Sequence, residues 1–158
     1  MIKIVAVGKI KEKALKELIA EYSKRLSGYT ALQIEEVSDE ATLQGNSEAQ
    51  NEIVRKKEGE RILARIKEKE YVILLDLKGK MLDSVSFAEK LDSLFTGGNS
   101  DITFVIGGSL GVSPEVKARA DYLWKLSDLT FPHALVRVIL LEQIYRAYRI
   151  QRGEPYHK

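Results

Sequence analysis

The 158-residue sequence contains no cysteine and has only two histidines, three prolines and one tryptophan. Without cysteine the chain can form no disulfide, no thiolate metal site and no cysteine nucleophile. Two histidines are too few for a multi-histidine metal site, so we expect no bound metal. No apolar run approaches the roughly 20 residues of a membrane span, and the N-terminal run is too short for a signal peptide. We therefore expect a cytoplasmic protein that contacts no membrane.

The chain also has little excess charge, since 25 basic residues stand against 23 acidic ones and the formal net charge is +2. This balance by itself does not indicate a nucleic-acid-binding protein. Length and composition favour a single domain over residues 1–158. Basic residues do gather near the C-terminus, at Arg146, Arg149, Arg152 and Lys158. If the chain binds a polyanion, this end is the candidate surface.

Apolar runs alternate with amphipathic segments, which predicts an α/β protein. The expected strands cover residues 2–7, 31–37, 71–77, 101–107 and 122–127. The expected helices cover residues 12–26, 48–68, 85–95, a short segment after Ser113, and 132–151. Residues 38–46 are typical of a loop, and residues 78–80 of a tight turn. The central strands are continuously apolar, as in a parallel sheet covered by helices on both faces.

In such sheets ligands bind beyond the carboxyl ends of the strands, and three of these ends are distinctive. The first is Leu75 with the aspartate that follows it. The second is the run Gly107-Gly108-Ser109-Leu110-Gly111, which has neither the dinucleotide-binding nor the P-loop spacing. Two interpretations of this run stay open: a backbone that a ligand approaches closely, or a plain turn that requires positive φ at glycine.

The third strand end, residues 126–131, mixes apolar and hydrogen-bonding side chains. Its members are Leu126, Ser127, Asp128, Leu129, Thr130 and Phe131. Such a mixture suits a ligand with both kinds of surface, such as an adenosine. The alternative is that Asp128 or Thr130 merely caps the following helix.

The last helix and the tail carry the remaining candidates. Arg137 lies among apolar residues and needs an acceptor, which we expect across a dimer interface. Glu142 and Arg146 have favourable i, i+4 spacing, although a solvated charged face would explain them too. In the short tail, for which disorder is the default, Tyr156 can stack on a base. His157 is a candidate for acid–base chemistry, because histidine is the residue type that suits proton transfer near neutrality.

These stretches together resemble one family. "VAVGK", "KKEGERIL", "LLDLKGK", "FVIGGSLG", "LSDLTFPHALVRVILLEQIYRA" and "GEPYHK" are similar to segments of the small SPOUT-class methyltransferases of the large-subunit methyltransferase H family, which modify N3 of a pseudouridine in large-subunit (23S) ribosomal RNA. The resemblance covers nearly the whole chain. It implies a parallel α/β sheet with a C-terminal trefoil knot, and S-adenosylmethionine as methyl donor. It also implies a homodimer with its active site at the subunit interface.

The resemblance further implies roles for individual residues. Cofactor contacts carry over to Leu75, Gly107 and residues 126–131. His157, reaching over from the partner subunit, is the expected general base, with Tyr156 positioning the target base. Arg149, Arg152 and Lys158 are expected to hold RNA phosphates, in a substrate recognised by shape within an assembled subunit or ribosome.

Two other classes of protein stay open on sequence grounds. A nucleotide- or phosphate-binding regulatory module without chemistry would keep the glycine turn and would not need the tail. A structural RNA-binding protein of the ribosome would carry a stronger positive charge than +2.

Overall fold

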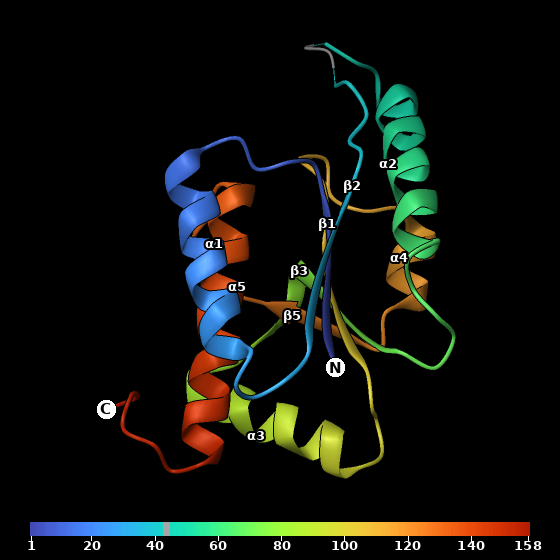
Figure 1. Ribbon diagram of the computed structural model, residues 1–158. Helices are drawn as coiled ribbons and strands as arrows, with labels where there is room; N and C mark the ends of the chain where they lie inside the picture. Colours follow the sequence, from blue (N-terminus) through green and yellow to red (C-terminus); the bar gives the residue numbers. More distant parts are fainter. Residues whose placement is uncertain (43–44) are drawn as a thin grey trace.

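The computed structural model describes residues 1–42 and 45–158, and it is built around a five-stranded parallel sheet (Figure 1). The strands are β1 (Ile2–Val7), β2 (Leu32–Val37), β3 (Tyr71–Met81), β4 (Ile102–Ile106) and β5 (Tyr122–Lys125). The helices are α1 (Lys13–Leu26), α2 (Glu48–Leu63), α3 (Ser84–Thr96), α4 (Pro114–Arg119) and α5 (His133–Gln151). The strand order is β2-β1-β4-β3-β5. The predicted α/β class and parallel sheet are confirmed.

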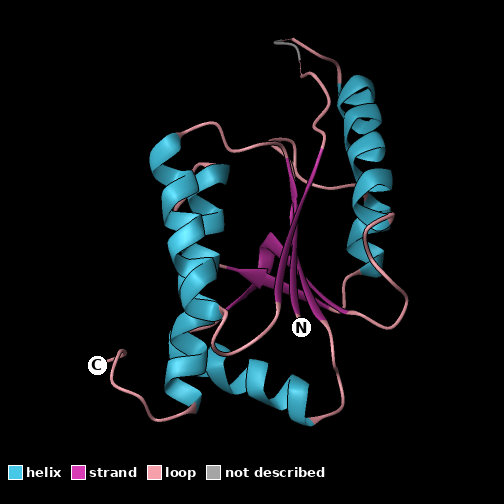
Figure 2. Cartoon of the chain, in the orientation of Figure 1, coloured by secondary structure: helices cyan, strands magenta, loops and turns pink. Residues whose placement is uncertain are grey.

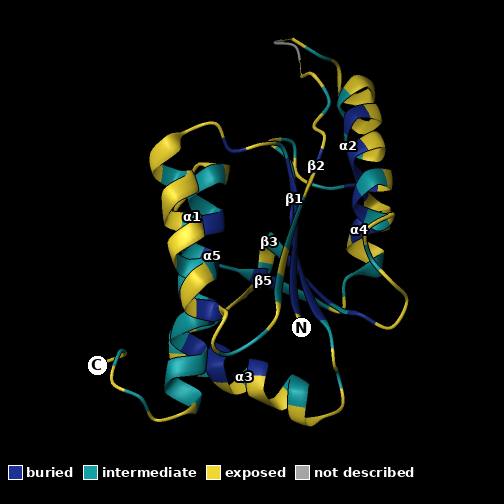
Figure 3. Ribbon diagram, in the orientation of Figure 1, coloured by how far each residue is buried: buried dark blue, intermediate teal, exposed yellow. Residues whose placement is uncertain are grey.

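Helices cover both faces of this sheet, with α1, α3 and α5 on one face and α2 and α4 on the other (Figure 2). Each face of the sheet has its own apolar core. Because successive side chains of a strand point to opposite faces, β1 contributes side chains to both cores. Ile2 and Ile4 pack in the first core, whereas Val5 packs in the second. Strands β1 and β4 are therefore buried along their whole length, whereas β2 and the far end of β3 have exposed residues, and the helices expose their outer surfaces (Figure 3).

Two element boundaries differ from the predictions. Helix α2 ends at Leu63 rather than near residue 68, and the chain turns before β3. Strand β3 does not stop before the expected turn at residues 78–80 but runs on to Met81. The expected loop over 38–46 includes residues 43–44, which lie outside the described residues.

The turn prediction was partly right, because the pairing of β3 with β5 is interrupted there. Trp124 pairs with Leu75 and again with Lys80, so residues 76–79 loop out of the ladder. Within this looped-out segment, the Asp76 side chain accepts a hydrogen bond from the Lys78 backbone N–H at 2.7 Å. A Cβ on Gly79 would lie 2.5 Å from the Leu123 backbone, so only glycine allows this approach.

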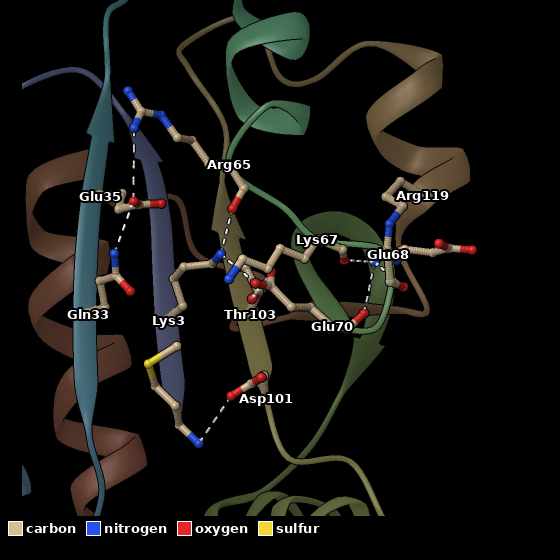
Figure 4. A network of polar contacts seen from close by, with 11 residues as sticks. Lys3, Gln33, Glu35, Arg65, Lys67, Glu68, Glu70, Asp101, Thr103 and Arg119 are labelled. Atoms are coloured by element: carbon tan, nitrogen blue, oxygen red, sulfur yellow. Dashed lines mark hydrogen bonds and ion pairs between the residues drawn. The ribbon is translucent and has the colours of Figure 1, made fainter.

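A buried polar network holds the amino ends of β1, β3 and β4 together (Figure 4). Lys3 Nζ contacts Glu70 Oε1 at 2.6 Å, and each residue is only 5% exposed. Thr103 donates to the other carboxylate oxygen at 2.8 Å. Burial alone would raise the pKa of Glu70, but the hydrogen bonds and charge of Lys3 and the Thr103 hydroxyl lower it below its ordinary value.

We predict that Lys3→Met lowers the free energy of unfolding by about 3 to 5 kcal/mol near neutral pH, because Glu70 then stays charged and unpaired in the core. In the wild type, the stabilisation from Glu70 is lost as pH falls through its lowered pKa. In the variant, burial favours the protonated carboxyl instead, so the two proteins should converge in acid.

Urea unfolding at neutral pH and at a pH below the ordinary pKa of glutamate measures both effects. Lys13→Met is the matched control, since it cuts only the exposed Lys13–Glu17 pair and should cost under about 1 kcal/mol. A Lys3→Met protein as stable as this control would contradict the expected role of the buried pair.

Candidate functional site

The start of α5 is fixed over the carboxyl ends of β1 and β2 by one arginine. Arg137 is 5% exposed. It donates to Glu36 Oε2 at 2.5 Å and to the carbonyl oxygens of Val7 at 3.2 Å and Gly8 at 2.6 Å. The expectation of an acceptor across a dimer interface was wrong, because the acceptors belong to the same chain. Backbone carbonyls at the end of a strand have no neighbouring strand to supply a hydrogen-bond donor. Here Arg137 of α5 supplies it.

A pocket of about 530 Å³ lies between the start of α3, the segment after β5, and α5. Its walls mix apolar and hydrogen-bonding side chains. The lining residues are Leu82, Asp83, Ser84, Val85, Trp124, Leu126, Ser127, Phe131, Ile139, Gln143 and His157. The pocket therefore joins the third distinctive strand end with the C-terminal tail.

The loop predicted to bind cofactor contributes to this pocket in part. Leu126, Ser127 and Phe131 line it, whereas Asp128, Leu129 and Thr130 are exposed. The Ser127 hydroxyl accepts from the Leu129 backbone N–H at 2.9 Å, and Asp128 pairs with Lys125. The alternative interpretation of this loop was wrong, because α5 begins after Pro132 without any side-chain cap.

The other two predicted cofactor contacts do not line the pocket. Leu75 is half-buried and packs against the first core. Gly107 lies directly after β4, and a Cβ there would come within 2.5 Å of Val112 Cγ1. The positive φ belongs to Gly111, at 83°, and not to Gly107. A plain turn therefore accounts for Gly111, and contact with Val112 already requires glycine at position 107.

Sequence analysis missed the pocket walls that come from α3 and the middle of α5. Asp83 caps α3 by accepting from the Ser86 backbone N–H at 2.7 Å. Next to it, the Ser84 hydroxyl donates to Gln143 at 2.7 Å, which ties α3 to α5. An aspartate before a helix was a readable signal for the cap. Nothing in the spacing showed which helix it would face.

A buried carboxylate behind the glycine turn was also missed. Glu58 of α2 is 4% exposed and accepts from the Glu40 backbone N–H at 3.0 Å. A Cβ on Gly108 would lie 2.7 Å from its Oε1, so Glu58 and the glycine turn are in direct contact. Burial raises the pKa of Glu58. The adjacent Gly59 packs as closely on Ser113, which explains the glycine within this helix.

The tail is ordered against its own chain. The Tyr156 hydroxyl donates to Glu142 Oε1 at 3.2 Å, and Arg146 lies 3.1 Å from His157 Nδ1. Glu142 and Arg146 are half-buried, so this pair holds the tail and is more than a solvated charged face. His157 lines the pocket of its own chain, and its expected arrival from a partner subunit stays a prediction.

These contacts restrict what the two tail residues can do chemically. Burial, followed by hydrogen bonding with Tyr22 and the charge of Glu142, raises the pKa of Tyr156 to about 12. Its hydroxyl therefore stays protonated near neutrality and acts as a donor. Arg146 is always protonated and donates to His157 Nδ1, which places the hydrogen of the neutral ring on Nε2.

The three cations predicted to hold phosphates lie in different surroundings. Arg149 is bound to Glu154 and to the Tyr29 hydroxyl. Arg152 and Lys158 are exposed and take part in no ion pair within the described ranges. The guanidinium of Arg152 lies 4.6 Å from the centroid of the Tyr29 ring. Of the three, Arg152 and Lys158 therefore have side-chain charges that are paired with no acidic side chain of the described residues.

Two further observations concern only the part of the chain that the structure describes. It holds no group of three or more acidic or histidine side chains placed to bind a metal ion. None of its helices is long and apolar enough to cross a membrane.

Comparisons with known proteins identify the family of this chain. Residues 1–157 match a family model described as "Predicted SPOUT methyltransferase". The fold and the match together define a methyltransferase with an α/β fold and a C-terminal trefoil knot. The chain belongs to the SPOUT methyltransferase family.

The curated relatives are similar over their whole length. A protein of Desulfitobacterium hafniense (strain DSM 10664 / DCB-2) is 58% identical over 99% of this chain and 98% of its own. One of Alkaliphilus oremlandii is 57% identical and one of Streptococcus thermophilus 53%, each over 99% of both chains. All three are named "Ribosomal RNA large subunit methyltransferase H".

Among solved structures, a probable methylase family protein of Haemophilus influenzae matches with a TM-score of 0.54 and 14% identity, over 99% of this chain and 70% of that one. At this identity the likeness concerns the fold alone.

Proposed function

We propose that this methyltransferase transfers a methyl group from S-adenosylmethionine to N3 of a pseudouridine in the RNA of the large ribosomal subunit. The observation that carries the proposal is the pocket, which is lined both by the loop after β5 and by His157 of the tail. A donor site and a candidate proton acceptor thus lie together. The full-length similarity to relatives named for large-subunit ribosomal RNA supports this choice of substrate.

The pocket suits S-adenosylmethionine chemically. Leu126, Phe131 and Ile139 offer apolar surface for an adenosine, and Ser127 offers a hydroxyl. Trp124 is 3% exposed, and its buried indole N–H has no acceptor among the described residues. Burying an N–H without an acceptor costs free energy, and an acceptor atom of a bound ligand would remove this cost. When bound, the cofactor supplies a methyl group that its sulfonium has already activated.

The chain's own task is then to orient the nucleobase and remove its proton. N3 of a uracil-type base carries a proton near neutral pH, and a positioned base that takes it accelerates transfer. His157 is the candidate, and its Nδ1 has to exchange Arg146 for the nucleobase before it can accept. Tyr156 orients the base as a permanent donor. Arg152 and Lys158 bind phosphate, and Arg149 is the third cation proposed for this surface.

We place this activity in the cytoplasm, on a homodimer that acts on assembled ribosomes. Leu135, Val136 and Ile139 of α5 are apolar yet only half-buried in the single chain. A second copy packed on this face would cover them. A small protein with no appended RNA-binding domain has little surface for reading sequence, so recognition of a folded ribosomal surface is the simpler route.

The experiment that tests the proposal is a methyl-transfer assay with labelled S-adenosylmethionine on 70S ribosomes and on free 23S RNA, both lacking the modification. We expect methylation of the ribosomes, faster than of the free RNA. Mass spectrometry of the digested RNA should place the methyl on N3 of a pseudouridine. No transfer to large-subunit RNA in either form would refute the proposed function.

A second prediction tests whether cofactor lies against the Gly107 backbone. Gly107→Ala alone collides with Val112, so the informative protein is Gly107→Ala combined with Val112→Ala. If the cofactor contacts this backbone, the added methyl should weaken binding by about 1 to 3 kcal/mol relative to Val112→Ala alone. Calorimetric titration with S-adenosylmethionine measures the difference. Equal affinity in the two proteins would mean that Gly107 serves only to accommodate Val112.

A third prediction concerns His157. His157→Ala should lower the rate of methyl transfer by on the order of 100-fold near neutral pH, which is the usual cost of losing a general base. The defect should shrink as pH rises, because solvent then takes the N3 proton. His133→Ala replaces the only other histidine and should leave the rate unchanged. A defect of the same size at every pH would make His157 a binding residue.

A further inference from the structure

A three-residue polar cluster lies where the chain leaves α5. Glu154 Oε2 accepts from the Tyr29 hydroxyl at 2.8 Å and is also bound by Arg149. Arg149 contacts the same hydroxyl at 3.1 Å, so each member touches the other two. Its second terminal nitrogen donates to the carbonyl of Pro155 at 3.1 Å. The cluster thus binds the tail at two successive residues.

The ring of Tyr29 is itself held by two side chains near the end of α5. It stacks on Tyr148, with centroids 5.7 Å apart, and the guanidinium of Arg152 lies 4.6 Å from its centroid. The hydroxyl therefore projects from a fixed position in the segment between α1 and β2. Arg149 is 22% and Glu154 31% exposed at the side chain, so their contact is partly shielded from water.

The backbone turns at the same place. Gly153 has a φ of 65°, and its N–H donates to the carbonyl of Ile150 at 3.0 Å, a geometry typical of a helix end. The Glu154 N–H then donates to the carbonyl of Arg149 at 2.9 Å. This turn ends the helix, but the side-chain cluster decides the direction in which residues 155–158 leave it.

We propose that Tyr29, Arg149 and Glu154 form a latch that positions Tyr156 and His157 for methyl transfer. The catalytic part of this inference rests on the proposed function. His157 comes three residues after Glu154, and a free segment of that length reaches about 10 Å in any direction. Fixing its origin keeps the ring near the pocket, and loss of such positioning lowers a rate without weakening cofactor binding.

The latch contacts are the same whether the tail enters the pocket of its own subunit or that of a partner subunit. Arg149 and Glu154 are neighbours across a single turn, and Tyr29 belongs to the same chain. Their contacts are therefore made within one subunit. Only the residues after Pro155 are free to reach a partner. The latch also pairs the charge of Arg149 with a carboxylate, so we expect this arginine to act mainly by positioning the tail and to bind phosphate less strongly than Arg152 and Lys158.

The test uses Tyr29→Phe, Glu154→Gln and Arg149→Gln, which change the hydrogen-bonding groups and keep most of the packing. Glu17→Gln is the matched control, because it cuts an exposed ion pair remote from the tail. The first measurement is the rate at which a carboxypeptidase releases Lys158 and His157, followed by mass spectrometry. The second is kcat and KM for ribosomes, and the third is the Kd for S-adenosylmethionine.

We expect each of the three variants to release its C-terminal residues several times faster than the control and to lose about tenfold in kcat. The KM for ribosomes and the cofactor Kd should stay within about twofold of wild type. The double variant Arg149→Gln with Glu154→Gln should be no slower than either single variant, because both changes remove the same contact. Circular dichroism should show unchanged folding.

Three outcomes would overturn the latch. The first is unchanged carboxypeptidase release in all three variants. The second is faster release with wild-type kcat, which would deny the tail's position any catalytic role. The third is a raised ribosome KM for Arg149→Gln with no effect of Glu154→Gln, which would make Arg149 a phosphate ligand. If wild-type protein methylates no ribosomal RNA, the proposed function fails, and the carboxypeptidase measurement still decides whether the latch exists.

Discussion

The contact between Arg137 and the carboxyl ends of β1 and β2 is the constraint from which the site follows. A guanidinium buried to this degree is costly unless it is paired with an opposite charge and hydrogen-bonded. Here Glu36 supplies the charge, and two strand-terminal carbonyls take further hydrogen bonds. Since α5 is a rigid rod, fixing it at Arg137 also fixes the residues of the turns that follow. These turns carry Ile139 and Gln143 on the pocket wall, and then Arg146 beside the tail.

The pocket is thus assembled from pieces that different forces hold in place. Trp124 stacks on Phe87 at 4.3 Å in the apolar core, and the start of α3 is joined to α5 by the bond from Ser84 to Gln143. The tail is held mainly by polar contacts, with one aromatic contact between Tyr156 and Tyr145. Such contacts are individually weak and exchange with water easily, so this wall of the pocket is the one best able to open for a nucleotide.

Much of this architecture was predictable from the sequence, because apolar periodicity is a local signal. This signal predicted the five strands, the parallel sheet and the loop after β5. It failed where a partner comes from far along the chain. Arg137 was correctly predicted to need an acceptor, but the 101 residues that separate it from Glu36 hid which one. The contact of Gly107 with a cofactor stays a prediction, and in the structure Val112 already occupies the space where a side chain at position 107 would lie. Tyr29 carries no motif at all, and only the fold brings it to Glu154.

The sheet has two edge strands, β2 and β5, and neither is suited to pairing with a further strand. β5 is only four residues long, and β2 carries the adjacent carboxylates Glu35 and Glu36. Short and charged edges are the usual protection against edge-to-edge association. A second copy of this chain would therefore have to dock through its helices. Two subunits joined in that way would keep their sheets separate, so the backbone hydrogen bonds of each sheet would all lie within one chain.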